Sequence, residues 1–126
     1  MFDHLRLTVR DVEASRRVYD PVMRALGLPP VARDDGGAAW GSQEAGFLIL
    51  TAASRDGAHD AAAPGLHHVA FAAPSRAVVD RVGEIVTGIG AEVLDPPGEY
   101  DDQPDHYAVF FRDPDGFKVE VVHVSP

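Results

Sequence analysis

The chain contains no cysteine, no long apolar run, and far fewer basic than acidic residues. Without cysteine, disulfides and thiolate metal sites are excluded. No stretch approaches the length of a membrane span, and no charged-then-apolar signal segment precedes the first predicted strand. A formal net charge of -9 argues against nucleic acid, whose phosphates require clustered Lys and Arg. We therefore expect a cytoplasmic protein with neither a membrane nor a nucleic-acid partner.

What remains is the composition of a small globular protein. The chain has 126 residues, of which 45% are hydrophobic and 25% charged. These values are ordinary for a folded domain, and the length is enough to bury a core. Composition alone thus predicts a single compact domain and no particular partner.

The first half of the chain predicts one strand, one helix and three further strands. Residues 3–9 alternate, with His4, Arg6 and Thr8 facing one side and apolar residues the other. Asp11 should cap a helix that ends at Gly27. Pro21 lies inside this helix and predicts a kink or a restart, with Asp20 as a second cap. Strands are expected at 28–32, 38–41 and 47–51.

The second half restarts the same pattern after a linker rich in Ala, Asp, Gly and Ser. We assign module one to about 1–53, the linker to about 54–65 and module two to about 66–126. Module two should contain a strand at 66–73, a helix from Ser75 to Gly90 and a strand at 91–94. A Pro- and Gly-rich loop at 95–105 and a hairpin of 107–112 with 117–124 complete it.

Three potential metal ligands occupy corresponding points of the near-repeat: His4, His68 and Glu120. Each histidine begins the first strand of its module, and Glu120 lies in the last strand of the second. Two imidazoles and a carboxylate can bind a divalent metal on one face and leave open positions for substrate. The alternatives are solvent-facing histidines, and a Glu120 that lies on an exposed strand face or pairs with Lys118 or Arg6.

Residues 4–11, 67–71 and 112–120, taken in order, resemble the vicinal oxygen chelate superfamily of glyoxalase I, extradiol dioxygenases, fosfomycin-modifying enzymes and bleomycin-binding proteins. The resemblance covers nearly the whole chain. It implies an α+β fold in which two paired βαβββ modules form a curved mixed sheet around a cleft, as one domain over 1–126, and a homodimer. It also implies metal ligands at His4, His68 and Glu120. The fourth family position falls near Ile49, where glyoxalase I needs Glu or Gln.

Further candidate site residues follow from strand geometry. If residues 113–116 form a four-residue loop, Val109 opposes Glu120, and Tyr107 shares the face of Glu120 as a candidate catalytic residue. Aromatic packing is the alternative for Tyr107. Arg6 could hold a substrate carboxylate or phosphate. Candidates for pocket lining are Trp40, Phe47, Ile49 and Phe111, although core packing is the more common role for any one of them.

The remaining histidines are expected to have lesser roles. In a strand, adjacent side chains point to opposite faces, so His67 should face away from His68 and at most be a hydrogen-bond partner. The assumed register also pairs His106 with His123 as structural residues. His59, in the linker, should be solvated.

Two functions are compatible with these residues. The first is a divalent-metal-dependent enzyme on a small substrate with neighbouring oxygens, acting as a lyase, isomerase or ring-cleaving dioxygenase. The cofactor would be one ion of Fe, Mn, Ni, Co or Zn. The second is a metal-free protein that binds a drug or an aromatic metabolite. The triad of His4, His68 and Glu120 favours the first, and the absence of a ligand near Ile49 favours the second.

Overall fold

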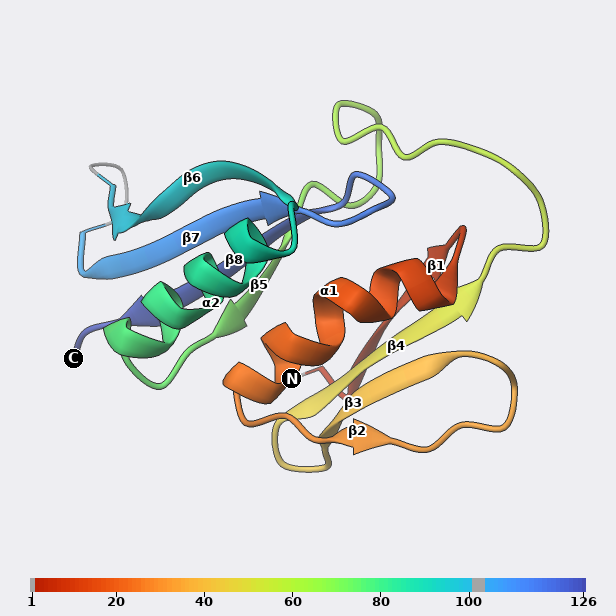
Figure 1. Ribbon diagram of the computed structural model, residues 1–126, viewed down its shortest axis with the longest axis horizontal. Helices are drawn as coiled ribbons and strands as arrows, with labels where there is room; N and C mark the ends of the chain where they lie inside the picture. Colours follow the sequence, from red (N-terminus) through yellow and green to blue (C-terminus); the bar gives the residue numbers. More distant parts are fainter. Residues whose placement is uncertain (1, 101–103) are drawn as a thin grey trace. The chain divides into compact units, whose positions relative to one another are not determined.

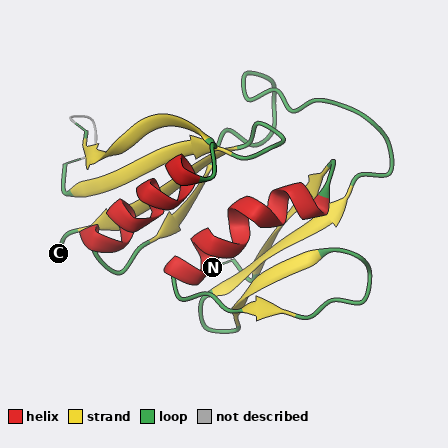
Figure 2. Ribbon diagram, viewed as in Figure 1, coloured by secondary structure: helices red, strands yellow, loops and turns green. Residues whose placement is uncertain are grey.

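A computed structural model describes residues 2–100 and 104–126. The chain divides into two compact units, Met1–Ala58 and His59–Pro126, which are described separately (Figure 1). Each unit holds one helix and one mixed four-stranded sheet (Figure 2), so the predicted α+β class and the repeated βαβββ order are confirmed. No helix in the described part of the chain is long and apolar enough to cross a membrane.

The first unit places its sheet strands in the order β1-β4-β3-β2. Strand β1 is parallel to β4, and the other neighbours are antiparallel. The alternation of β1 is as predicted: Leu7 and Val9 are buried, whereas His4, Arg6 and Thr8 are exposed. The elements are β1 (His4–Val9), α1 (Val12–Ala25), β2 (Pro30–Val31), β3 (Ala38–Ser42) and β4 (Gly46–Ala52).

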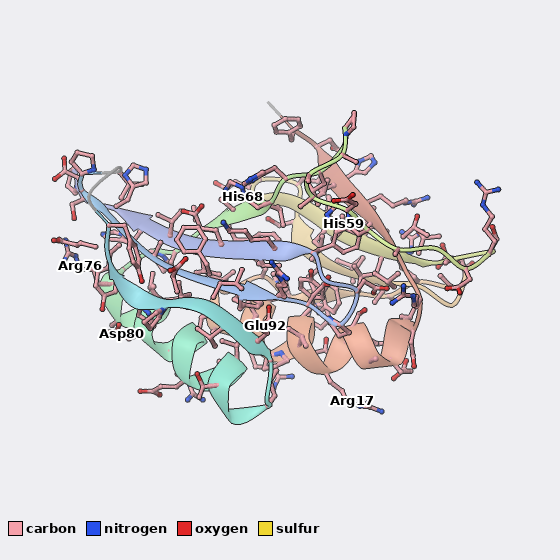
Figure 3. The ribbon with its side chains drawn as sticks, turned by 90° about the horizontal axis from the view of Figure 1, so that it is seen from above. Arg17, His59, His68, Arg76, Asp80 and Glu92 are labelled. Carbon is pink, nitrogen blue, oxygen red and sulfur yellow. The ribbon has the colours of Figure 1, made fainter. Side chains whose placement is uncertain are left out.

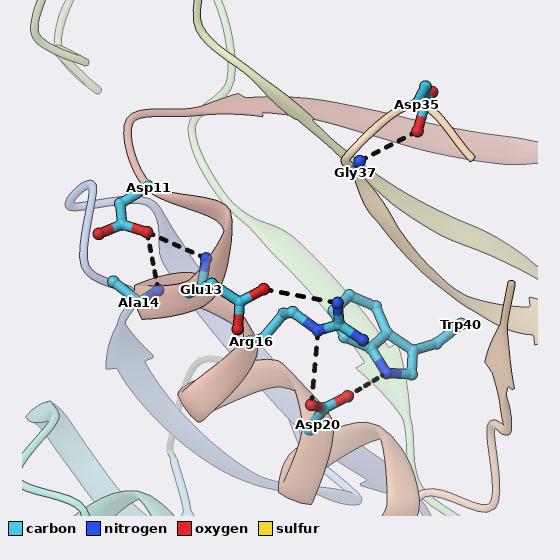
Figure 4. A network of polar contacts seen from close by, with 8 residues as sticks. All are labelled: Asp11, Glu13, Ala14, Arg16, Asp20, Asp35, Gly37 and Trp40. Atoms are coloured by element: carbon cyan, nitrogen blue, oxygen red, sulfur yellow. Dashed lines mark hydrogen bonds and ion pairs between the residues drawn. The ribbon is translucent and has the colours of Figure 1, made fainter. Parts of the chain in front are cut away.

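Helix α1 begins and ends as predicted, but it runs through Pro21 as one helix. Asp11 Oδ1 accepts hydrogen bonds from the backbone N–H of Glu13 and Ala14, at 3.0 and 3.2 Å. Gly27 follows the C-cap with a φ of 77°, a conformation that glycine adopts without strain. The predicted restart with Asp20 as a second cap is wrong, because Asp20 instead accepts a hydrogen bond from Trp40 Nε1 (Figure 4).

The turn between β2 and β3 is held by a side chain that binds two groups. Asp35 accepts hydrogen bonds from Arg33, at 2.5 and 3.1 Å, and from the backbone N–H of Gly37 at 3.0 Å (Figure 4). The bonds from Arg33, followed by the one from Gly37, hold the pKa of the Asp35 carboxyl well below its ordinary value. This local network supports the turn that returns the chain from β2 into β3.

The second unit repeats the topology with the order β5-β8-β7-β6. Strand β5 is parallel to β8, and the other neighbours are antiparallel. Ser75 Oγ accepts from the backbone N–H of Val78 at 3.2 Å, which confirms the predicted helix cap. The elements are β5 (Val69–Ala72), α2 (Arg76–Gly88), β6 (Glu92–Glu99), β7 (His106–Arg112) and β8 (Lys118–Val124).

Strand β6 is longer than the predicted strand at 91–94, which was expected to give way to a loop at residue 95. It continues to Glu99 through two irregularities of register, between Val93 and Asp95 and between Asp95 and Gly98. Pro96 and Pro97 are tolerated because β6 is the end strand of its sheet, where a missing N–H donor breaks no ladder bond. Residues 101–103 of the predicted loop lie outside the described residues.

The predicted register of the β7–β8 hairpin is wrong by one residue. Arg112 pairs with Lys118 and Phe110 with Glu120, so the connection contains residues 113–117. Asp113 causes the longer loop, because its Oδ1 accepts from the backbone N–H of both Asp115 and Phe117 at 2.9 Å. The shift exchanges the faces assigned to every residue of β7.

Candidate functional site

The register of the second sheet gathers polar side chains on the face that α2 does not cover. Directly opposed residues share a face, so Phe110 lies beside Glu120, and Ala70 of β5 flanks Glu120 on the other side. The opposite face carries the fully buried Val109, Phe111 and Val119, on the side of α2. Figure 3 shows His68 on the side of the sheet away from α2.

The polar face forms a cavity of about 570 Å³ within the second unit. All four strands of the sheet contribute, together with the residues just before β5. Its lining combines three histidines, two acids, one lysine and two aromatic rings with small apolar residues: His67, His68, Ala70, Asp95, Tyr100, His106, Ala108, Phe110, Lys118, Glu120 and Val122.

His68 and Glu120 meet in this cavity as the triad prediction required of them. His68 Nε2 lies 3.1 Å from Glu120 Oε1. The Glu120 side chain is only 13% exposed and that of His68 33%, so the contact is largely shielded from bulk water. A partly buried carboxylate needs such a partner, because burying it alone is costly.

His67 joins this pair, contrary to the prediction that it faces away. The Nδ1 atoms of His67 and His68 lie 2.8 Å apart, and both rings line the cavity. The alternation of strand side chains does not apply here because β5 begins only at Val69. The expectation of a hydrogen-bond partner is confirmed, and His67 becomes part of the site.

The chain His67–His68–Glu120 permits two tautomeric arrangements. When His67 Nδ1 donates, His68 Nδ1 accepts, and His68 donates from Nε2 to the Glu120 carboxylate. When His68 Nδ1 donates to His67, the lone pair of His68 Nε2 faces Glu120 instead. The second arrangement presents a neutral imidazole nitrogen and a carboxylate oxygen together, and this is the donor pair of a metal site.

Aromatic and cationic groups form another wall of the cavity. The ring of Phe110 has Tyr100 at 6.0 Å and His68 at 6.5 Å between ring centroids, and Lys118 Nζ lies 5.0 Å from its centre. Burial, followed by the charge of Asp95, raises the pKa of Tyr100. Phe110 was not predicted as a site residue because the assumed register placed it on the other face of the sheet. The signal for the correct register was Asp113, whose side chain can accept two backbone hydrogen bonds and so favours the longer loop.

Three predicted site residues serve other roles. Tyr107 lies on the α2 side of the sheet, where its hydroxyl donates to Asp80 Oδ1 at 2.5 Å, and this bond raises its pKa. It therefore has no geometric basis as a catalytic residue beside Glu120. Phe111 is fully buried and Trp40 is 1% exposed, so both are core residues. Trp40 also forms part of the wall of a separate cavity of about 330 Å³ in the first unit.

The first unit holds the other predicted residues on the exposed face of its sheet. His4 Nδ1 lies 2.7 Å from Asp3 Oδ1. Arg6 is exposed and is directly beside the half-buried Ile49. Arg6 neighbours Ile49 as Ala70 neighbours Glu120, so Ile49 occupies the position that Glu120 has in the second sheet. Within neither unit do three described His, Asp or Glu side chains gather as a metal site.

The sequence predicted a solvated His59 in the linker, but the structure packs this residue against Phe117. Its ring lies 4.5 Å from that of Phe117 between centroids, and its Nε2 is buried without a hydrogen-bond partner among the described residues. Figure 3 labels it together with His68.

Comparison with known proteins decides the family. The model of the Glyoxalase/Bleomycin resistance protein/Dioxygenase superfamily matches residues 1–121. The chain belongs to this superfamily. The predicted resemblance is thus confirmed, and the fold is glyoxalase-like.

Relatives within the superfamily match over nearly their whole length. The uncharacterized protein YqjT of Bacillus subtilis (strain 168) is 34% identical over 131 residues, which cover 97% of this chain and 98% of the relative. A glyoxalase/bleomycin resistance protein from Albidiferax ferrireducens T118 has a TM-score of 0.81 at 27% identity, with 98% of each chain covered. A related domain from Frankia sp. EAN1pec has a TM-score of 0.77 at 27% identity and covers 99% of this chain and 98% of its own.

Proposed function

We propose that this superfamily member is a divalent-metal-dependent enzyme acting on a small substrate with two neighbouring oxygens. His4, His68 and Glu120 would hold one ion of Fe, Mn, Ni, Co or Zn. The bound ion would supply Lewis acidity for lyase or isomerase chemistry, or oxygen activation for ring cleavage if it is iron.

The spacing of His68 and Glu120 carries the proposal. Two metal–ligand bonds of about 2.1 Å at a right angle put the ligand atoms about 3 Å apart. The 3.1 Å between His68 Nε2 and Glu120 Oε1 fits that geometry without rearrangement. Their donor types, a neutral imidazole and a carboxylate, suit the ions named above.

The hydrogen bonds made by the other ring nitrogen of each histidine also favour a role as metal ligands. Histidine ligands commonly use their other ring nitrogen to bind a carboxylate or another acceptor, which orients the ring. Asp3 stands in that relation to His4, and His67 to His68. His4 lies in the other unit, and its place in the ligand set rests on the repeat and on the family resemblance.

The cavity walls would bind and orient the substrate. Ala70 and Ala108 leave space beside Glu120, while Phe110 and Tyr100 provide flat apolar surfaces. The Glu120 carboxylate, once its bond from His68 is released, can hold a proton taken from the substrate. Its low exposure keeps competing water away from that exchange.

Metal content of untagged protein, measured by elemental mass spectrometry, tests the proposal. We expect about one equivalent in the wild type and loss of the metal in Glu120→Ala and His68→Ala. Glu92→Ala and His106→Ala are matched controls: Glu92 pairs with Arg112 on the same sheet, and His106 lines the same cavity without contacting the pair. Unchanged metal content in Glu120→Ala would end the proposal.

A second candidate function is that of a metal-free protein that binds an aromatic small molecule. It is favoured by the apolar Ile49, which cannot be a metal ligand. The position that is a carboxylate in the second sheet is apolar in the first. A wild type that takes up no metal on titration, but binds aromatic ligands in the cavity of Phe110, would make this the function. Phe110→Ala should then weaken ligand binding, whereas Glu120→Ala should not.

A further inference from the structure

A second cavity adjoins the first within the same unit. It encloses about 400 Å³ between residues 59–62 and the ends of β7 and β8, with Arg112 and Gly116 in its wall. His67 and Lys118 line both cavities. The two cavities therefore adjoin at these two side chains.

Lys118 is the only lysine of the chain, and it carries an uncompensated charge between the cavities. Among the described residues it forms no ion pair, and its Nζ lies 5.0 Å from the centre of the Phe110 ring. Its side chain is half-buried. An ammonium group that is partly withdrawn from water and lacks a carboxylate partner is well suited to bind an anion.

His59 contributes a second group that lacks a partner. Its Nε2 is buried with no hydrogen-bond partner among the described residues, while its ring packs against Phe117. A buried polar nitrogen without a partner costs about 1–3 kcal/mol, and a ligand oxygen that accepts its hydrogen once the ring turns toward the cavity would recover much of this. Orphan groups of this kind are uncommon in folded proteins.

The carboxylates near the second cavity each have a partner in the protein, and the only one that lines the cavity itself among the described residues is the exposed Asp60. Glu92 Oε2 lies 3.4 Å from Arg112 Nε, and Asp60 Oδ1 accepts from the backbone N–H of Ala62 at 2.9 Å. Glu120 is held by His68. The contact with Glu92 involves only Nε, and a guanidinium has four further N–H donors. The donors left for a ligand are therefore cationic or neutral hydrogen-bond donors.

We propose that the second cavity binds an oxyanion, a carboxylate or a phosphate, through Lys118, His59 and Arg112. Taken with the proposed function, on which this last step rests, the substrate is an anionic molecule with two ends. Its neighbouring oxygens meet His68 and Glu120, and its anionic group occupies the second cavity. The anion site itself requires no metal.

The single lysine allows a direct test. Reductive methylation with ¹³C-formaldehyde keeps the charge of Lys118 and yields one lysine side-chain signal, distinct from that of the N-terminal amine. Inorganic phosphate and acetate are titrated separately into chelator-treated protein, with chloride at equal ionic strength as the control. We expect a saturable shift of the Lys118 signal. Stronger binding of phosphate would indicate a phosphorylated substrate, and stronger binding of acetate a carboxylate.

His59→Phe preserves the ring against Phe117 but removes both nitrogens. It should weaken the anion affinity at least tenfold and leave the Lys118 signal of the anion-free protein in place. Arg81→Gln, which alters an exposed arginine paired with Glu84 on α2, should change nothing. A linear shift matching that of chloride, or an unchanged affinity in His59→Phe, would overturn the proposal.

This outcome is independent of the metal measurement. Saturable anion binding by a protein that takes up no metal would leave the anion site standing and remove the metal enzyme. Metal uptake without anion binding would remove only the anion site.

Discussion

The indole of Trp40 donates from Nε1 to Asp20 Oδ1 at 2.8 Å, across a part-buried contact between β3 and α1 (Figure 4). Tyr19 packs beside it, with ring centroids 6.0 Å apart. Trp40 is almost wholly inaccessible, so this hydrogen bond is what makes an indole N–H acceptable at that position. Trp40, which the sequence suggested as a pocket residue, therefore stabilises the first unit through this hydrogen bond and through its packing.

Asp20→Ala should therefore lower the free energy of unfolding by about 1–3 kcal/mol, because it leaves the indole N–H buried without an acceptor. Asp20→Asn retains an oxygen acceptor and should lose less. Arg16→Ala, which removes the surface contacts of 3.8 Å with Asp20 and 3.6 Å with Glu13, should cost under about 0.5 kcal/mol. Urea denaturation followed by fluorescence of Trp40, the single tryptophan, measures all three. Equal losses in the Ala and Asn variants would contradict the hydrogen-bond explanation.

At the site, residue type predicted more than residue position did. A histidine next to one apolar strand and a glutamate within another signalled the His68–Glu120 contact, since such groups need a partner when partly buried. Tyr107 and Phe111 were misassigned because a face depends on register, and one extra loop residue exchanges the faces. Phe110 was overlooked for the same reason.

Among the elements, α2 and β6 fit together through one glycine. A Cβ built on Gly83 would lie 2.5 Å from Pro97 Cγ and 3.0 Å from its Cδ. Gly83 is buried in the helix, and the rigid proline ring occupies the space that a side chain would need. Two residues unfavourable to regular structure thus allow the helix to lie close to the edge strand.

Gly83→Ala should destabilise the protein by about 1–3 kcal/mol through overpacking, despite the better helix propensity of alanine. Gly88→Ala is the matched control in the same helix, since a Cβ there meets nothing within 4 Å. It should gain up to about 1 kcal/mol. Urea denaturation followed by far-UV circular dichroism measures both variants. A stabilising Gly83→Ala would show that Pro97 moves aside at little cost.

The elements that local chemistry determines were predictable from sequence. Asp11 and Ser75 cap helices wherever their side chains can reach free N–H groups, and the alternation in β1 needs only a buried face. The course of β6 was not predictable, because Pro96 and Pro97 are typical of loops and are allowed only at a sheet edge. Edge position is a property of the assembled sheet.

At the scale of the whole molecule, the two sheets share one topology but differ in chemistry. Ile49 and Glu120 hold equivalent places beside the first strand of their sheets. The cavity with the His68–Glu120 pair and the adjoining proposed anion site both belong to the second unit. The repeat thus gives both units the same strand order, whereas differences at a few positions, such as Ile49 and Glu120, place the polar cavity in the second unit.

Open sheets also bear on association, and we predict that the protein is a homodimer paired through β5. This end strand contains no proline and no charged residue, the usual features that block edge pairing. Ala73 donates its N–H to Val122 O of β8 at 2.8 Å, so the alternation of the strand turns the N–H of Ala72 outward.

Light scattering coupled to size exclusion should give twice the 13.5 kDa of one chain. Ala72→Pro, which removes the outward donor, should shift the mass toward the monomer, whereas Ala72→Ser should not; a dimer that persists in Ala72→Pro with unchanged affinity would rule out the β5 edge.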